Sequence, residues 1–201
     1  MNLKIEAARR QLGMALDLHI RGLDPVSVHC LASGGCEVIE HFAAAGEQGS
    51  LSAFLLEQNP DLKIADLRKL QRQHWNAFKH ATGKSEGSAA RADDELLQAF
   101  SSRNNDAPLF VGWTDYGNAT GMMPIEAQVF VAWYLAKYPA KAAPDNLRDE
   151  IDRMFPGLPT QRPAKQRAEL VRAIERARKN KIVMADPKTE HRPLVLGWPP
   201  A

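Results

Sequence analysis

The apolar residues of this chain recur at the spacing of an α-helix in one segment after another. Near the start they fall three or four positions apart, at Ile5, Ala8, Leu12, Leu16, Ile20 and Leu23. This spacing places them on one face of a helix, because a helix repeats every ~3.6 residues. No segment alternates apolar and polar residues over a length that would predict a sheet. We therefore predict an all-α fold.

Glycine and proline mark most breaks between these segments and predict about seven to eight helices. The first helix ends at Gly22, and the second is expected over residues 26–45, before Gly46. Further helices are expected over residues 51–58, 61–82, 94–101, 124–138, 145–155 and 163–181. Residues 109–116 are compatible with a helix or a strand, and the following GNATG is predicted to be a turn.

The length of 201 residues favours a single compact domain, which we place at residues 1–181. The last twenty residues, 182–201, contain four prolines and no helical period. They predict an irregular, Pro-rich C-terminal tail that packs on the domain or extends from it. The small, polar residues 84–91 predict a surface loop.

The composition is typical of a soluble globular protein, with 44% hydrophobic and 25% charged residues. No apolar run approaches the ~18 residues that a membrane-spanning helix needs, and the start lacks a signal-peptide pattern. Cys30 and Cys36 lie in one predicted helix, about 9 Å apart along its axis, which is too far for a disulfide. We expect a cytoplasmic protein with reduced thiols and no membrane contact.

Two adjacent glycines, Gly34 and Gly35, lie in the middle of the second predicted helix. Each costs about 1 kcal/mol relative to alanine in a helix interior, so the pair needs a physical reason. One reason is the close crossing of another helix. The alternative is a small-molecule pocket in which a ligand lies against the bare backbone.

Two histidines lie six residues apart in the segment RQHWNAFKHA, residues 72–81. Helical geometry places one mainly apolar set of residues on the same face of this predicted helix: Ile64, Leu67, Leu70, His74, Trp75, Phe78 and Ala81. We therefore predict that His74 is buried and that His80, on the other side, is at least partly exposed. The polar residues near His80 form a candidate site, made of Arg72, Asn76, Lys79 and His80.

Three segments carry a resemblance: EAARRQL, DPVSVHCLASGGCEVIEHF and HWNAFKHA. Together they resemble an uncharacterised family of bacterial all-helical proteins over about the first half of the chain. The segment from Asn76 to His80 is more distantly similar to the HEPN superfamily of helical ribonucleases and toxin-like proteins. That resemblance implies RNA binding or cleavage by the Arg72–His80 site. The chain departs from the motif, because Trp75 stands where an arginine is expected before Asn76.

Positive charge is concentrated in the last predicted helix. Residues 162–181 contain eight Lys or Arg and two Glu, so this segment carries +6, although the whole chain carries only +2. A row of four cations lies beside the apolar stripe of this helix, at Lys165, Arg172, Arg176 and Lys179. Such a row could follow a nucleic-acid backbone, or it could simply be a solvated face.

Motifs for metal and cofactor chemistry are absent from the sequence. None of the six histidines follows a glutamate by three positions, and no cysteine pair has zinc-site spacing. His29, Cys36 and Glu40 fall within about 60° on the second helix, but a metal there would need further ligands from another element. We expect no metal and no cofactor.

Together these features favour a non-enzymatic interaction or binding protein of the bacterial cytoplasm, acting through an unknown protein partner or self-association. One alternative is a HEPN-like RNA-binding protein or ribonuclease, including a form that has lost catalysis, with RNA as partner. The other alternative is a small-molecule-binding helical protein.

Overall fold

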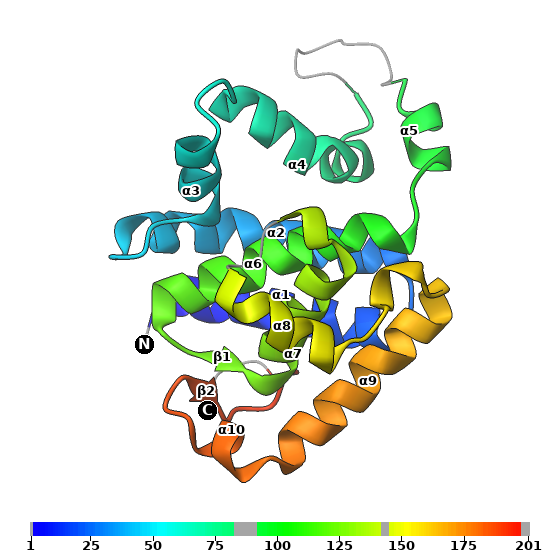
Figure 1. The fold of residues 1–201 in the computed structure, drawn as a ribbon. Coiled ribbons are helices and arrows are strands. Elements are labelled where there is room, and N and C mark those ends of the chain that lie inside the picture. The colour runs from blue at the N-terminus through cyan, green and yellow to red at the C-terminus, as the bar shows by residue number, and fades with distance from the viewer. Residues whose placement is uncertain (1, 83–91, 142–144, 198–201) are drawn as a thin grey trace.

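A computed structural model describes residues 2–82, 92–141 and 145–197, and this part of the chain is built almost entirely of helices (Figure 1). It contains ten α-helices, three short 3₁₀ helices and one pair of two-residue strands, which confirms the predicted all-α fold. Two of the α-helices, α5 and α10, have only five residues each. None of the helices in the described ranges combines the length and apolar character that crossing a bilayer requires.

The elements follow one another along the chain as given below. In order they are α1 (Leu3–Arg21), α2 (Pro25–Ala45), α3 (Leu51–Gln58), α4 (Ile64–Lys79), α5 (Asp94–Gln98), η1 (Ser102–Asn105), α6 (Asp106–Thr120), β1 (Met123–Pro124), α7 (Ile125–Lys137), η2 (Pro139–Lys141), α8 (Asp145–Met154), η3 (Leu158–Thr160), α9 (Pro163–Lys179), α10 (Lys181–Ala185) and β2 (Thr189–Glu190).

Local capping explains the limits of the first two helices. The Asn2 side chain accepts a hydrogen bond from the backbone N–H of Lys4 at 2.9 Å, and Gly22 ends α1 with φ at 68°, where a side chain would be strained. Asp24 then caps α2 by accepting from the Ser27 backbone N–H at 2.9 Å. These caps lie where the sequence predicts the break between the two helices.

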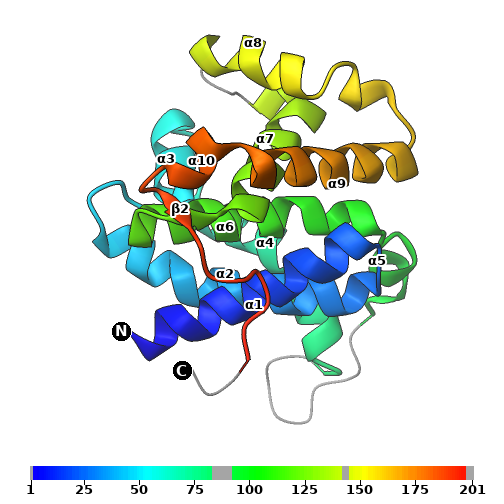
Figure 2. The same cartoon turned by 90° about the horizontal axis from the view of Figure 1, so that it is seen from below.

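The core lies between α1, α2, α6 and α7, with α9 packed on the outer side of α7 (Figures 1 and 2). Its largest fully buried side chains include Trp113 on α6 and Phe130 on α7. The indole N–H of Trp133 on α7 donates to the carbonyl of Gln166 on α9 at 2.9 Å, which satisfies a buried donor at that interface. This helical core supports α3 and α4, which lie together above α2 and α6 in Figure 1.

The close approach of α1 to α2 explains the second glycine of the pair. A Cβ atom at Gly35 would lie 2.7 Å from Cγ of Leu12 and 3.3 Å from the carbonyl oxygen of Ala8, both on α1. A Cβ atom at Gly34 would make only an ordinary contact with Gln11, at 3.5 Å. The helix crossing therefore requires glycine at position 35 and tolerates a methyl group at position 34.

Gly35→Leu is expected to lower the free energy of unfolding by about 1–3 kcal/mol, because the new side chain must displace Leu12 or push α1 away from α2. Urea denaturation followed by circular dichroism measures the change. The matched control, Gly34→Ala, should be neutral or slightly stabilising, because alanine favours the helix. Equal midpoints for Gly35→Leu and the unchanged protein would contradict the role of Gly35 in this crossing.

The prediction of a turn at GNATG is wrong, because α6 continues through Thr120 and the chain turns only at Gly121, where φ is 74°. The ambiguous residues 109–116 are helical and belong to α6. The polar residues of GNATG are held in the helix by other contacts. The Asn118 side chain donates to the Gly49 carbonyl at 3.0 Å, and the Thr120 hydroxyl donates to the Tyr116 carbonyl at 2.8 Å.

The fourth helix also differs from its prediction. It covers Ile64–Lys79, within the predicted residues 61–82, and His80 follows with extended backbone. Ile64 and Leu70 are exposed by 40% and 66%, so their predicted burial is wrong. The reason is that this part of α4 does not pack on the helical core. The loop predicted at residues 84–91 lies outside the described residues.

The C-terminal segment contains one helix that its sequence does not predict. Asn180 caps α10 by accepting from the Ile182 backbone N–H at 3.0 Å, so the irregular conformation predicted from residue 182 is wrong as far as Ala185. Strand β2 then pairs in parallel with β1. Beyond β2 the chain runs across α1, as Figure 2 shows, where the Arg9 guanidinium donates to the Leu194 carbonyl at 2.8 Å.

Candidate functional site

A cavity of about 890 Å³ lies between the α2–α6 pair and the α3–α4 pair. In Figure 1, α3 and α4 lie above α2 and α6. Side chains from α2, α3, α4, α6 and α7 line this cavity. Leu70 of the apolar face predicted for α4 lines this cavity and remains exposed, whereas Leu67 and His74 of the same face are buried.

An aromatic cluster joins α4 to α2 at one end of this cavity. The His29 ring on α2 contacts the rings of His74 and Phe78 on α4, with centroids 5.6 and 5.9 Å apart, and that of Phe100 at 5.3 Å. The middle of α4 is connected to α3, where the Gln71 amide reaches the Ser52 hydroxyl at 3.5 Å. Helix α4 is therefore attached to α3 at its middle and to α2 in its second half.

Most of the cavity wall is apolar or aromatic. On α6 and α7, the Phe110 ring stacks on the Tyr134 ring with centroids 4.1 Å apart and planes at 14°. The other apolar and aromatic lining residues are Leu51, Phe54, Leu55, Leu67, Leu70, Trp75, Ala107, Pro108, Val111, Leu135, Tyr138 and Ala140. Such a wall suits the hydrophobic part of an organic ligand.

The polar part of the wall comes from several elements, among them one face of α2, which carries His29, Ser33, Glu37 and Glu40. Burial lowers the pKa of His29 to about 4, although its hydrogen bond with the Asn105 side chain opposes this change. The imidazole is therefore neutral at pH 7. Cys36 also lines the cavity, but its thiol donates to the Pro108 carbonyl at 3.0 Å and burial raises its pKa, so it is held protonated.

Negative charge collects at the α3 end of the cavity. Glu37 is paired with Arg72 of α4 at 3.5 Å, whereas no ion pair joins Glu40 to a cation within the described residues. Behind Glu40, the fully buried Asp115 on α6 accepts a hydrogen bond from the Leu51 backbone N–H at 2.7 Å. Burial and the nearby Glu40 raise the pKa of Asp115 to about 6.

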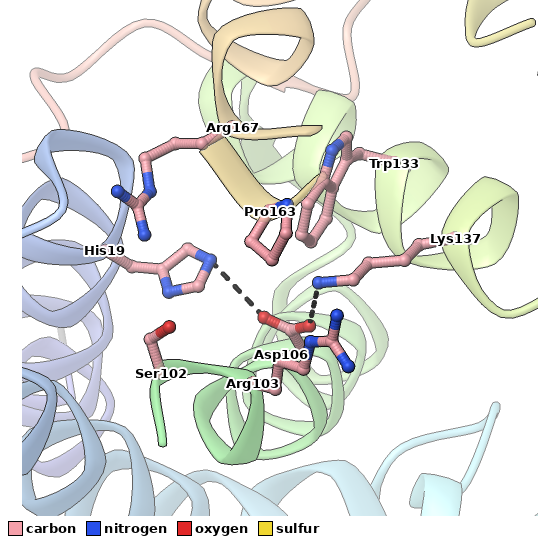
Figure 3. A pocket seen from close by; sticks show the side chains of 8 residues that line it. All are labelled: His19, Ser102, Arg103, Asp106, Trp133, Lys137, Pro163 and Arg167. Atoms are coloured by element: carbon pink, nitrogen blue, oxygen red, sulfur yellow. Dashed lines mark hydrogen bonds and ion pairs between the residues drawn. The ribbon is translucent and has the colours of Figure 1, made fainter. Parts of the chain in front are cut away.

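A second pocket, of about 20 Å³, lies between α1, η1, α7 and the start of α9 (Figure 3). Its centre is the Asp106 carboxylate, which lies 2.6 Å from the ammonium of Lys137 and 3.5 Å from Nε2 of His19. Arg103 and Arg167 complete its charged lining. This volume suits a water molecule, not an organic ligand, so we regard the pocket as a polar cluster of the core.

The structure confirms the predicted burial of His74, which is exposed by 7%, and the predicted exposure of His80. Of the four residues of the predicted site, Arg72, Asn76, Lys79 and His80, Arg72 alone lines the cavity. The Lys79 ammonium instead lies 4.5 Å from the centre of the Trp75 ring, and His80 follows the last residue of α4.

The other predicted site residues also lie outside the cavity wall. Gly35 faces Leu12, and it is the neighbouring Ser33, Cys36 and Glu37 that line the cavity. The row on α9 is exposed to solvent and consists of Lys165, Arg172, Arg176 and Lys179. Within it, Arg172 is paired with Glu169 at 2.5 Å. Across the described ranges, no three His, Cys, Asp or Glu side chains are grouped so that they could hold a metal ion.

Comparison with known proteins found no matching family profile, no matching curated protein and no matching solved structure. Function therefore has to be inferred from the chemistry of the cavity itself. One sequence signal marks its polar wall: His29, Ser33, Glu37 and Glu40 recur at helical spacing within the otherwise apolar α2.

Proposed function

We propose that the protein is a non-enzymatic binding protein whose ligand is a small, mainly apolar organic molecule held between α2–α6 and α3–α4. The observation that supports this function best is the cavity of about 890 Å³. Ligand sites in proteins commonly measure roughly 300–1,000 Å³, and they combine an apolar wall with a few polar groups. The wall described above has this composition.

The state of the polar groups supports binding more than catalysis. The Cys36 thiol is held protonated and donates to a backbone carbonyl, so it is a poor nucleophile. The pKa of His74 is lowered by burial, and its ring packs against the Phe100 ring with centroids 5.2 Å apart. These groups contribute shape and polarity to the cavity wall.

Nile red, a neutral dye that fluoresces in apolar sites, is expected to bind the protein and to be excluded by Val111→Trp. Val111 lies on the α6 wall, so an indole there would occupy much of the space. We expect the affinity for the dye to fall by about tenfold or more, which corresponds to about 1.4 kcal/mol. Fluorescence titration measures the dissociation constant, and circular dichroism checks that the variant remains helical.

The matched control is Leu23→Trp, which adds the same indole at an exposed residue of the α1–α2 connection, outside the cavity. It should bind the dye as the unchanged protein does. The proposal would be wrong if the unchanged protein failed to bind the dye, or if Val111→Trp and Leu23→Trp bound it equally well. A dimer that excludes the dye would indicate instead that this surface is an interface between two copies.

A further inference from the structure

The charge distribution in the cavity indicates which class of ligand it accepts. Glu40 lines the cavity and is only partly exposed, and among the described residues it forms no ion pair. Glu37, one turn earlier on the same helix, is neutralised by Arg72. The negative charge of Glu40 is therefore left without a counter-ion beside an apolar wall.

A second carboxylate increases this negative charge. Asp115 is fully buried, and its Oδ2 atom has no hydrogen-bond partner among the described residues. It lies close enough to Glu40 for the two charges to repel each other, and it is joined to the wall through the backbone of Leu51. The negative charge of Glu40 therefore destabilises the ionised form of the buried Asp115 carboxylate, and a cation bound at Glu40 would relieve this repulsion.

The aromatic part of the cavity wall is suited to the same kind of ligand. Phe110 on α6 and Tyr134 on α7 line the same cavity as Glu40, and their two rings stack with centroids 4.1 Å apart. The faces of such rings attract organic cations and also pack against apolar groups. A carboxylate ligand would instead be repelled at Glu40. The wall also contains two arginines, Arg72, which is paired with Glu37, and Arg103, which lies on η1.

We infer that the ligand is an organic amine, with its ammonium group at Glu40 and its apolar body against Phe110 and Tyr134. This inference rests on the proposed function, because it requires the cavity to be the binding site. The expected ligand is a protonated amine with a hydrophobic body. The site should bind it more tightly than a neutral alcohol or a carboxylate of the same length.

Displacement of Nile red by decylamine, decanol and decanoate tests this preference at neutral pH. The three probes have the same alkyl chain and differ in the charge of the head group. We expect decylamine to bind about tenfold more tightly than decanol, and decanoate to bind most weakly. Equal affinities of decylamine and decanol would overturn the inference, whereas failure of the dye itself to bind would overturn the proposed function.

Glu40→Gln is expected to reduce the affinity for decylamine to that for decanol, while the dye still binds, because the amide keeps the size of the side chain and removes its charge. The matched control is Glu57→Gln, which removes one exposed carboxylate from α3 outside the cavity wall and should retain the preference. A preference for decylamine that persists in Glu40→Gln would assign the cation site elsewhere and contradict the inference.

Discussion

Replacing Glu190 by alanine is expected to lower the free energy of unfolding by about 3–5 kcal/mol, because it leaves the Arg9 guanidinium buried without its charged partner. Arg9 is fully buried on α1, and its Nε atom lies 3.2 Å from the Glu190 carboxylate. The same carboxylate accepts from the Tyr116 hydroxyl at 2.9 Å and from Arg192 at 2.6 Å. Urea denaturation at neutral pH measures the loss.

The matched control is Glu169→Ala, which removes a carboxylate from an ion pair on the surface of α9. Glu169 pairs with Arg172, whose side chain is exposed by 52%. An exposed pair of this kind contributes about 0–1 kcal/mol, so the variant should be nearly as stable as the unchanged protein. Similar losses in the free energy of unfolding for Glu190→Ala and Glu169→Ala would contradict the structural role that we assign to the buried Arg9–Glu190 pair.

Stability is also expected to fall as the pH is lowered from 6.5 towards 4, because burial lowers the pKa values of His19, His29 and His74 in the folded protein. Burial lowers the pKa of His19 to about 4, against an opposing effect of Asp106, and burial likewise lowers that of His29 to about 4. The unfolded chain binds protons near the ordinary pKa of 6.5. Below that pH, protonation favours the unfolded chain over the folded protein. The resulting loss of folding stability is about 3 kcal/mol at pH 4 for each of His19 and His29.

Asp115 opposes this trend. Its pKa is raised by burial and by Glu40 from 3.8 to about 6, so the folded protein takes up a proton before the unfolded chain does. This uptake favours the folded state by about 2 kcal/mol as the pH falls through the same interval. Asp115→Asn removes the opposing effect, so its loss of stability between pH 6.5 and 4 should exceed that of the unchanged protein by about 2 kcal/mol. Thermal or urea unfolding at several pH values measures the loss of stability of the unchanged protein and of Asp115→Asn.

A flat stability between pH 6.5 and 4 in Asp115→Asn would contradict the burial of neutral imidazoles at positions 19 and 29. Equal slopes for this variant and the unchanged protein would instead contradict the raised pKa of Asp115. The two contributions are therefore measured separately.

Local signals predict the helices that pack directly on the core. Spacing of apolar residues identifies α1, and the caps at Gly22 and Asp24 place the break before α2. The same spacing predicts correctly that His74 is buried. These features depend on interactions between residues within one or two helical turns of each other. Such local interactions can be predicted from the sequence.

The candidate cavity could be predicted only in part. Helical spacing shows that His29, Ser33, Glu37 and Glu40 share one face of α2, but it does not show what that face meets. In the structure, Glu40 borders a cavity beside Asp115, which lies on a helix far along the chain. Neither this juxtaposition nor the aromatic wall has a local signal.

The sequence by itself determined that the chain is helical and which residues share a helix face. Only the tertiary structure decided what each face contacts: Gly35 meets α1, Leu70 remains exposed beside a cavity, and Arg9 meets Glu190 across 181 positions of the chain. The physical reason is that a helix period depends on neighbouring residues, whereas packing depends on which distant segments fill the same space.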